Sequence, residues 1–257
     1  VQKSYFGNVL LEDPFFESFR ADYVGFDKWF KKKSDEVAYV CYAKNRLVGF
    51  LYLKVEDEGE NYSDIAPRFA PRKRLKIGTL KVAGHGLRIG ERLLKIVFDN
   101  ALANKVDEIY VTIFNRTPDQ LRLIELLEEW GFTYFGEKQT PTGAEQVYTR
   151  SFARSVDLEN PKSTFPYISA NANHFIVPIY PDYHTELLPD SILNNESPDN
   201  FRENEPHRNA LSKVYISHSR ERNLKKGDSI LFYRTGGKYA GVATTIGIVE
   251  TVHDNIK

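Results

Sequence analysis

An alternating strand that runs into a glycine-rich turn, and from there straight into an amphipathic helix, constrains this chain more than any other feature. The strand pattern spans 74–82, the turn holds Gly84 and Gly86, and the helix opens near Gly90. At such a junction the helix N–H groups and the positive end of its dipole point to one place. Glycines let the backbone approach a ligand closely. The stretch is suited to hold a pyrophosphate, although a strand–turn–helix without a ligand shows the same pattern.

The elements around this stretch predict an α+β domain. A tight polar turn at 44–46 separates two strand patterns and indicates a hairpin. Apolar residues recur at helical spacing after the glycine turn. Thr117 and Pro118 supply the N-cap and the first position of a second helix, which stops at Gly131. The expected order is a helical start, strands at 37–42, 47–55 and 74–82, a helix from 89, a strand at 108–114, a helix from 118, and strands at 132–135 and 146–152.

Residues 5–152 resemble the GNAT N-acetyltransferase family in this order of elements and in two motifs. The acetyl-CoA motif of that family, Gln/Arg-x-x-Gly-x-Gly/Ala, aligns with residues 85–90, where His85 and Arg88 replace the usual residues and Gly90 matches. The second signature is an Asn after a strand, followed by a helix ending in Leu-Tyr-x-x-x-Gly-Phe. It aligns with Asn115 and residues 126–132, with leucine in place of the tyrosine.

The resemblance implies acetyl-CoA as the cofactor. It assigns the pyrophosphate to the backbone amides of 87–92, with Arg88 and Arg92 adding positive charge. It assigns the pantetheine arm to 80–82, which it would pair with like an added strand. The candidate cofactor-binding residues are Leu80, Lys81, Val82, Leu87, Arg88, Ile89, Gly90, Glu91, Arg92 and Asn115.

The resemblance leaves the catalytic residues open. In the family the tyrosine often reprotonates the leaving CoA thiolate, which Leu127 cannot do. Many members carry a Glu on the strand before the glycine turn, whereas residues 72–84 contain no carboxylate. The carboxylate candidate for the base is Glu56, in an acidic run that more usually marks a solvated loop; an ordered water or the substrate itself are the alternatives. On the acceptor side the candidates are Tyr23 and Trp29.

Composition narrows the class of protein. The formal net charge of +0 over 257 residues argues against a general polyanion binder. The single cysteine, Cys41, excludes an internal disulfide, fits a cytoplasmic location and is expected to be a core residue. No apolar run reaches the roughly 18 residues that a membrane span needs. The histidines have no cysteine partners and no ligand spacing, so no metal site is expected.

The second half of the chain is predicted to be β-rich. Residues 155–172 are expected to be a linker between a first domain at 1–154 and a second at 173–257. Strands are expected at 174–180, 213–217, 229–234 and 240–252, with Pro178 marking an edge strand and 181–206 irregular. The Lys-Lys-Gly-Asp-Ser-Ile-Leu-Phe-Tyr run at 225–233 and the strand after it resemble the PUA-like superfamily, which includes ASCH and EVE domains. That resemblance implies a small β barrel, complete or incomplete in this chain, and binding of RNA or a modified base.

Charge in the second half is unevenly distributed. Acidic residues concentrate between Asp182 and Glu205, whereas basic residues outnumber acidic ones from 206 onward. Cations interleaved with aromatic residues suit phosphate contact and base stacking, and a solvated barrel rim over an aromatic core is the alternative. The candidate nucleic-acid residues are Arg220, Arg222, Lys225, Lys226, Arg234 and Tyr233.

The sequence thus predicts an acetyl-CoA-dependent N-acetyltransferase joined to a PUA-like domain, with an amine acceptor that is linked to or associated with RNA. The alternative is a sensor or adaptor without catalysis, whose first domain binds an acyl-CoA and whose second binds nucleic acid. A homodimer is compatible with either function. Leu127 and the missing strand carboxylate favour the alternative, whereas the glycine turn and Asn115 favour the enzyme.

Overall fold

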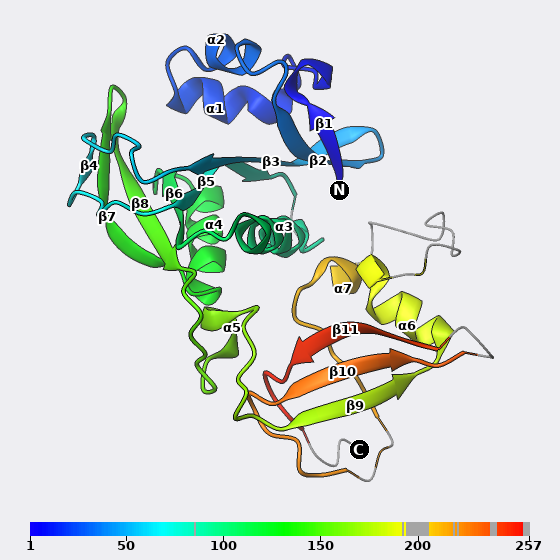
Figure 1. Cartoon of the computed structure of the whole chain (residues 1–257). Coiled ribbons are helices and arrows are strands. Elements are labelled where there is room, and N and C mark those ends of the chain that lie inside the picture. The colour runs from blue at the N-terminus through cyan, green and yellow to red at the C-terminus, as the bar shows by residue number, and fades with distance from the viewer. Residues whose placement is uncertain are drawn as a thin grey trace. The chain divides into compact units, whose positions relative to one another are not determined.

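The computed structural model describes residues 1–84, 86–191, 193, 206–217, 219, 221–236 and 241–253. The chain divides into two compact units, Val1–Ala153 and Arg154–Lys257. The first unit is an α+β unit with a mixed sheet, and the second carries a smaller sheet of its own (Figure 1).

The first unit is built on an eight-stranded sheet with the order β1-β2-β3-β5-β6-β8-β7-β4. All of its neighbouring strands are antiparallel except β5 and β6, which are parallel at the centre. The strands are β1 (Gln2–Tyr5), β2 (Val37–Ala43), β3 (Arg46–Glu56), β4 (Ile65–Ala66), β5 (Arg74–Val82), β6 (Glu108–Ile113), β7 (Thr133–Thr140) and β8 (Gly143–Ser151).

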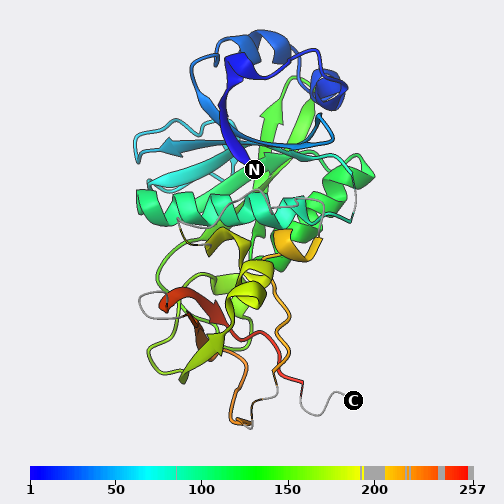
Figure 2. The same cartoon turned by 90° about the vertical axis from the view of Figure 1, so that its right-hand side faces the viewer.

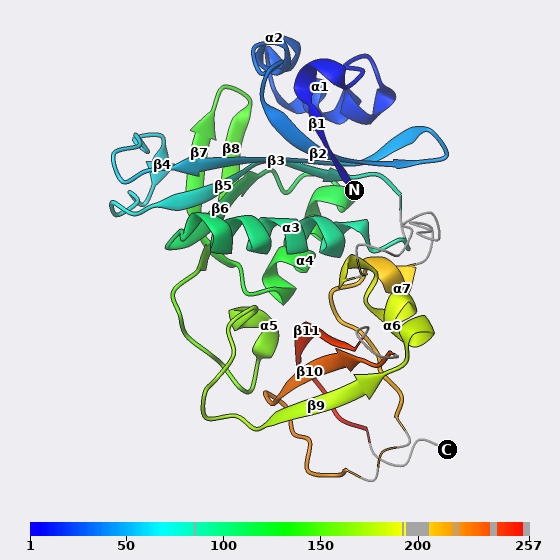
Figure 3. The same ribbon diagram turned by 45° about the vertical axis from the view of Figure 1, so that its right-hand side comes forward.

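Helices cover both faces of this sheet. α1 and α2 lie on one face, and α3 and α4 lie on the other, as the turned views also show (Figures 2 and 3). Their bounds are η1 (Phe6–Asn8), η2 (Pro14–Phe16), α1 (Glu17–Asp22), α2 (Phe26–Lys31), α3 (Ile89–Asn104) and α4 (Pro118–Glu129).

Local sequence signals account for most of these boundaries. Lys44 and Asn45 both have positive φ in the β2–β3 turn, which is the backbone that a two-residue hairpin requires. Thr117 and Gln120 form a capping box at the start of α4, and Pro118 occupies its first position. The helices and strands expected between 37 and 131 are confirmed to within a few residues.

The β7–β8 hairpin is longer than the sequence predicted. Strands were expected at 132–135 and 146–152, but pairing continues from Thr133 to the turn at Thr140 and Gly143. The added residues are mostly polar, and because they lack apolar alternation they gave no strand signal. Their strand conformation comes from tertiary pairing, with β8 on one side and β4 on the other side of β7.

In the second unit the described residues form a three-stranded sheet with the order β11-β10-β9, and no closed barrel is seen among them. β9 pairs with β10 in parallel and β11 pairs with β10 antiparallel. Pro178 lies in β9, at an edge of the sheet, as expected. The elements are α5 (Pro161–Thr164), β9 (His174–Ile179), α6 (Pro181–Leu187), η3 (Pro189–Ser191), α7 (Pro206–Asn209), β10 (Ser229–Arg234) and β11 (Val242–Ile248).

Three expectations for this half were wrong. Residues 213–217 are not a strand, and the last strand is shorter than 240–252. Pro181–Leu187 is a helix rather than an irregular segment. Proline at the first helical position and Asp182 in the first turn both favour a helix start there. The buried His184 of this helix forms a hydrogen bond with Thr244, with 2.8 Å between His184 Nε2 and Thr244 Oγ1.

No helix in the described ranges has the length and apolar character that crossing a membrane would require.

Candidate functional site

The two parallel strands at the centre of the sheet separate at their carboxyl ends. β5 and β6 pair over four residues each, from Arg74 with Glu108 to Ile77 with Val111. Beyond that point β5 stays paired with β3 as far as Val82, and β6 stays paired with β8 as far as Ile113. In the part of the chain that the structure describes, the β6-facing side of 79–82 thus has no strand partner. The carboxyl ends of parallel strands are where ligands of α/β sheets bind.

A β-bulge marks the point of separation. Tyr52 pairs with Thr79 and Leu53 pairs with Ile77, so Gly78 is an extra residue in β5. A bulge bends its strand and increases the local twist. A Cβ atom on residue 78 would lie 2.7 Å from the Tyr52 ring, which explains why glycine occupies the bulge. The bulge also changes which side chains of β5 face the α1 side of the sheet: Lys76 faces Tyr110, and Lys81 faces Phe15.

The loop after β5 and the start of α3 complete one wall of this site. Gly84, Gly86 and Arg88 all have positive φ, with Arg88 at 50° in the left-handed region. The Arg88 side chain does not cap α3, whereas α4 is closed by its own capping box. The first turn of α3 therefore offers backbone amides and the positive end of its dipole without a cap from the residue that precedes it.

The candidate cofactor residues of the first wall are contiguous with this turn. Leu80 and Ile89 are buried, Arg88 is exposed, and the others between 80 and 92 are half-buried. Asn115 is exposed and lies two residues after the end of β6, on the other side of the separation. His85, the first residue of the aligned motif, lies outside the described residues. A Cβ on residue 90 would lie 2.8 Å from Leu126 Cδ2, so Gly90 also sets the approach of α3 to α4.

Helix α1 bridges the separated strands on the opposite face of the sheet from α3. Near its start, Lys81 Nζ of β5 donates to the Phe15 carbonyl at 2.5 Å and to Ser18 Oγ at 2.7 Å. Just after its end, the Tyr23 hydroxyl donates to Glu145 Oε1 of β8 at 2.5 Å. Because β6 lies between β5 and β8, α1 passes over the end of β6.

Further hydrogen bonds fix the end of α1. Gln120 Nε2 of α4 donates to Asp22 Oδ2 at 2.9 Å, and Thr142 Oγ1 donates to the Asp22 carbonyl at 2.8 Å. Arg116 Nη2 donates to the Thr142 carbonyl at 2.7 Å, and its guanidinium lies 3.9 Å from the centroid of the Phe114 ring. Three loops at the carboxyl ends of the strands thus form one hydrogen-bonded frame.

Glu145 is the buried carboxylate within this frame. It is 3% exposed and lies next to Gln146, which pairs with Ile113 at the end of β6. Tyr23 packs on Phe114, with ring centroids 5.5 Å apart. Burial, then the negative charge and hydrogen bond of Glu145, raise the pKa of Tyr23 far above its ordinary value. The Tyr23 phenol therefore stays protonated at any ordinary pH.

Glu56, the carboxylate candidate from the sequence, lies at the other end of β5. It pairs with Arg74, the first residue of that strand, whereas the glycine turn follows the last. Eight residue steps separate the two ends, on the order of 26 Å. Glu56 is buried and accepts hydrogen bonds from Tyr110 at 2.7 Å and Tyr62 at 3.0 Å. This placement does not favour Glu56 as a base for chemistry at the separated strand ends.

The ionisation of Glu56 fits a structural role. Burial alone would raise its pKa, but the Tyr110 hydrogen bond and the charges of Lys76 and Lys54 outweigh burial and hold the pKa below its ordinary value. Burial, then the charge of Glu56, raises the pKa of Tyr62 to about 12. The cluster is a neutralised, hydrogen-bonded core network.

Trp29, the other acceptor-side candidate, is half-buried and packs against Phe6, Phe26 and Tyr52. Leu127, which stands in place of the family's tyrosine, is fully buried. Cys41 is buried, as expected.

The nucleic-acid candidates of the second unit do not form one exposed set. Arg222, Lys225 and Lys226 are exposed and Tyr233 is 40% exposed, but Arg234 is buried, which was not expected. Arg220 lies outside the described residues. The Gly227–Asp228 pair forms a structural corner: the buried Asp228 carboxylate accepts the backbone N–H groups of Asn173 and Lys225.

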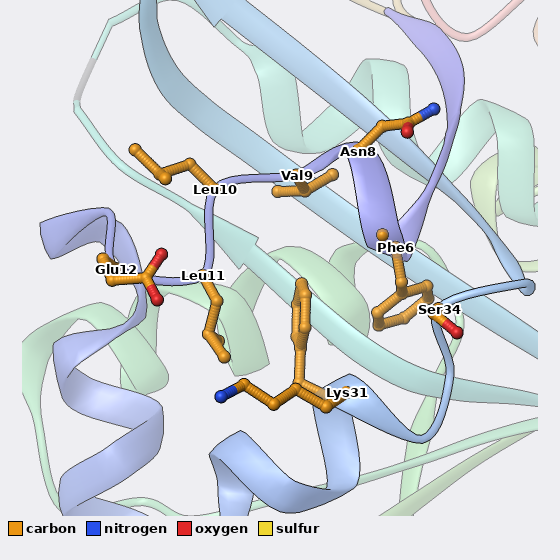
Figure 4. A pocket seen from close by; sticks show the side chains of 10 residues that line it. Phe6, Asn8, Val9, Leu10, Leu11, Glu12, Lys31 and Ser34 are labelled. Carbon is orange, nitrogen blue, oxygen red and sulfur yellow. The ribbon is translucent and has the colours of Figure 1, made fainter.

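A surface hollow of about 420 Å³ lies between the segment from Phe6 to Glu12 and the end of α2 (Figure 4). None of the candidate cofactor residues lines it.

Sequence reasoning missed Glu145 and named Tyr23 without a partner. Glu145 falls in the polar half of the β7–β8 hairpin, which was not predicted as strand. The alternation of Glu145, Val147 and Thr149 on one face of β8 with Gln146 and Tyr148 on the other is a period-two signal that could have found it.

Comparisons with known proteins return structures of acyl and acetyl transferases. This chain is similar to an aminoglycoside 6′-acetyltransferase type Ii (15% identity, TM-score 0.38, 59% of this chain and 97% of that chain). It is similar to an acyl-CoA N-acyltransferase from Pseudomonas aeruginosa (13% identity, TM-score 0.37, 58% and 98%). It is also similar to the NatC complex bound to Gag peptide and CoA (20% identity, TM-score 0.32, 54% and 81%).

No protein-family model matches the chain, and no curated protein matches it. At these identities and TM-scores, the likeness to solved structures carries no argument about function, which rests on the geometry of the chain itself.

Proposed function

We propose that the first unit is an acyl-CoA-dependent N-acyltransferase that moves an acetyl group from acetyl-CoA to an amine. The observation that carries the proposal is the separation of two parallel strands beyond a bulge, directly before a left-handed loop and a helix start that the Arg88 side chain does not cap. This arrangement offers an unpaired strand edge to a pantetheine arm and a helix N-terminus to a pyrophosphate.

The residues present fit the chemistry of CoA. A Cβ atom on residue 84 or 86 would meet no atom within 4 Å, so a phosphate can approach the backbone there. Arg88 and Arg92 supply positive charge next to the first turn of α3. The edge of β5 from Thr79 to Val82 supplies backbone donors and acceptors for the amide groups of the arm. Asn115 borders the site from the β6 side.

Bound acetyl-CoA supplies a thioester whose carbonyl carbon is the electrophile. The residues of this chain contribute position and polarity. Backbone N–H groups at the separated edge of β5 are suited to polarise a carbonyl, and the α1 bridge encloses the strand ends on the acceptor side. Leu127 is buried and apolar, so the proposal assigns it no proton transfer.

The proposal does not include RNA. The buried position of Arg234 removes one of the expected phosphate contacts, and the described residues of the second unit show no closed barrel.

Calorimetric titration of CoA tests the site, and the chain offers a closely matched pair of arginines. Arg88 lies 3.3 Å from Glu91 and is 53% exposed at its side chain, and Arg122 lies 3.3 Å from Asp119 and is 57% exposed. We expect Arg88→Glu to weaken CoA binding at least tenfold, because it places a negative charge beside the pyrophosphate. Arg122→Glu should leave the affinity unchanged.

Gly90 is unsuited to this test because any side chain there also displaces Leu126. Equal CoA affinity in both arginine variants would contradict the placement of the pyrophosphate. Absence of CoA binding to the wild type would contradict the proposed function as a whole. Binding of CoA without thiol release to any amine would favour a sensor of acyl-CoA over an enzyme.

A further inference from the structure

Three carboxylates among the described residues accept a hydrogen bond from a tyrosine hydroxyl, and they differ in what neutralises them. Glu36 accepts from Tyr52 and is paired with Lys33 at 2.8 Å. Glu56 accepts from Tyr62 and Tyr110 and is paired with Lys54 at 3.0 Å. For Glu145, which accepts from Tyr23, the described residues provide no cation within ion-pair distance.

Two cations on neighbouring segments bond elsewhere. Lys138 is its cross-strand partner on β7, yet Lys138 Nζ is paired with Asp64 at 3.3 Å. Arg116 donates to the Thr142 carbonyl and lies against the ring of Phe114. Among these three carboxylates, Glu145 is therefore the one that meets a tyrosine hydroxyl without an ion-pair partner among the described residues.

Tyr23 connects Glu145 to the site. Its hydroxyl hydrogen is donated to Glu145, so the lone pairs of Tyr23 Oη remain to accept a hydrogen bond. Tyr23 is half-buried, whereas Glu145 is almost inaccessible. The phenol packs on Phe114, directly after β6, where the strands have separated. Of the two residues, Tyr23 is thus the more accessible to an amine at these strand ends.

We propose that Tyr23 Oη binds the amino group of the acceptor and that Glu145 takes a proton from it through the Tyr23 hydroxyl. The inference rests on the proposed function. The acceptor class it implies is a primary amine that is cationic in solution. Tyr23 is the catalytic residue, and Glu145 acts through it.

The proton transfer balances in one step. An ammonium N–H gives its proton to Tyr23 Oη while the Tyr23 hydroxyl proton moves to Glu145 Oε1, which leaves a neutral amine, a neutral carboxylic acid and an intact phenol. The amine nitrogen then forms a bond to the acetyl carbon as the carbon–sulfur bond breaks. The second amine proton ends on the CoA thiolate, and Glu145 returns its proton to solvent.

The charged groups that face the pair are consistent with this direction. Asp22, at the end of α1, adds negative charge beside Tyr23, and Arg116, after β6, opposes it. Lys138 of β7 is opposite Glu145. Burial and the neighbouring Glu145 raise the pKa of Tyr23 and keep its phenol neutral, which a proton relay through the hydroxyl requires.

The pH dependence of thiol release tests the relay. The measurement uses the full-length protein with acetyl-CoA and a panel of primary amines: an alkylamine, a polyamine and a peptide with a free α-amino group. We expect Tyr23→Phe and Glu145→Gln each to lower kcat/KM about a hundredfold at pH 7. The loss should shrink as the pH rises towards about 10, where an alkylamine loses its proton without help. A loss caused by misplaced structure would not be recovered by raising the pH.

Two variants serve as controls. Tyr52→Phe and Glu36→Gln remove a tyrosine–carboxylate pair that a lysine already neutralises, so their pH profiles should match the wild type. Tyr23→Phe keeps the aromatic packing on Phe114, which covers the case in which Glu145→Gln does not fold. CoA binding measured by calorimetry should stay within twofold of wild type in both relay variants.

The outcomes separate the relay from the CoA site. A wild type that binds no CoA overturns the proposed function and this inference with it. Normal CoA binding combined with wild-type pH profiles in Tyr23→Phe and Glu145→Gln overturns the relay alone. Normal CoA binding without thiol release to any amine also overturns the relay.

Discussion

The two ends of β5 differ in pairing and in charge. At its amino end, β5 is paired with strands on both sides, and the neighbouring Glu56 carboxylate is hydrogen-bonded by Tyr110 and neutralised by Lys54. At its carboxyl end, β5 has lost its β6 partner, and the buried carboxylate of Glu145 has no cation within ion-pair distance among the described residues. One sheet thus holds two tyrosine–carboxylate clusters in contrasting electrostatic states.

The contrast teaches how to distinguish a structural network from a reactive one. Charges at the amino end are matched, so they stabilise the fold and need nothing from outside. At the carboxyl end, a strand edge has no partner strand among the described residues and the buried Glu145 carboxylate has no ion-pair partner among them, which folding alone does not favour. We infer that this end is shaped for a ligand.

The largest effect is expected at the amino end, for Arg74→Leu. The Arg74 side chain is buried, its Nε lies 2.6 Å from Glu108, and its guanidinium covers the Phe69 ring at 4.2 Å. Removing one partner of a buried ion pair costs about 4 kcal/mol of the free energy of unfolding. Urea denaturation measures this. The control is Arg72→Leu, because Arg72 is exposed and contacts the same carboxylate, with its Nη1 atom 3.5 Å from Glu108 Oε1. It should cost less than about 1 kcal/mol.

Gly78→Ala should give an intermediate effect at the boundary between the two ends. The new methyl group would lie 2.7 Å from Tyr52, and overpacking of this kind costs about 2 kcal/mol. Because the bulge directs β5 away from β6, CoA binding should weaken several-fold as well. Gly59→Ala, where a Cβ atom meets nothing within 4 Å, should change neither quantity. A Gly78→Ala protein with unchanged CoA affinity would separate the bulge from the ligand site.

The smallest effect is expected for Glu56→Gln, and it should depend on pH. The pKa of Glu56 is lower in the folded chain than its ordinary value of 4.5. The carboxylate therefore contributes stability that is fully present above that value and is lost as the pH falls through the folded pKa. We expect a cost of about 1–2 kcal/mol at pH 7, which disappears in acid.

Thermal unfolding of wild type and Glu56→Gln between pH 7 and pH 3 measures this difference. Glu60→Gln is the control. The exposed Glu60 binds the same lysine, with its Oε2 atom 3.1 Å from Lys54 Nζ. A constant difference between wild type and Glu56→Gln across that range would show that packing, not charge, gives Glu56 its role.

Local signals let the sequence predict much of the first unit. The bounds of β5 were predicted to the residue, and Thr117 was predicted as the N-cap of α4. These features depend on contacts within a few residues, such as alternation, capping and turn chemistry. The polar half of the β7–β8 hairpin was missed because its strand conformation depends on pairing with β4 and β8.

The candidate site divides along the same line. By itself, the sequence determined the strand, the glycine turn and the helix start, because a strand–loop–helix junction is written in adjacent residues. Only the tertiary structure decided that Glu56 lies at the far end of β5 and that Tyr23 meets Glu145, 122 positions later in the chain. Such a pairing depends on strand register and on the path of α1 over the sheet, which the long-range packing of the chain sets and no local pattern encodes.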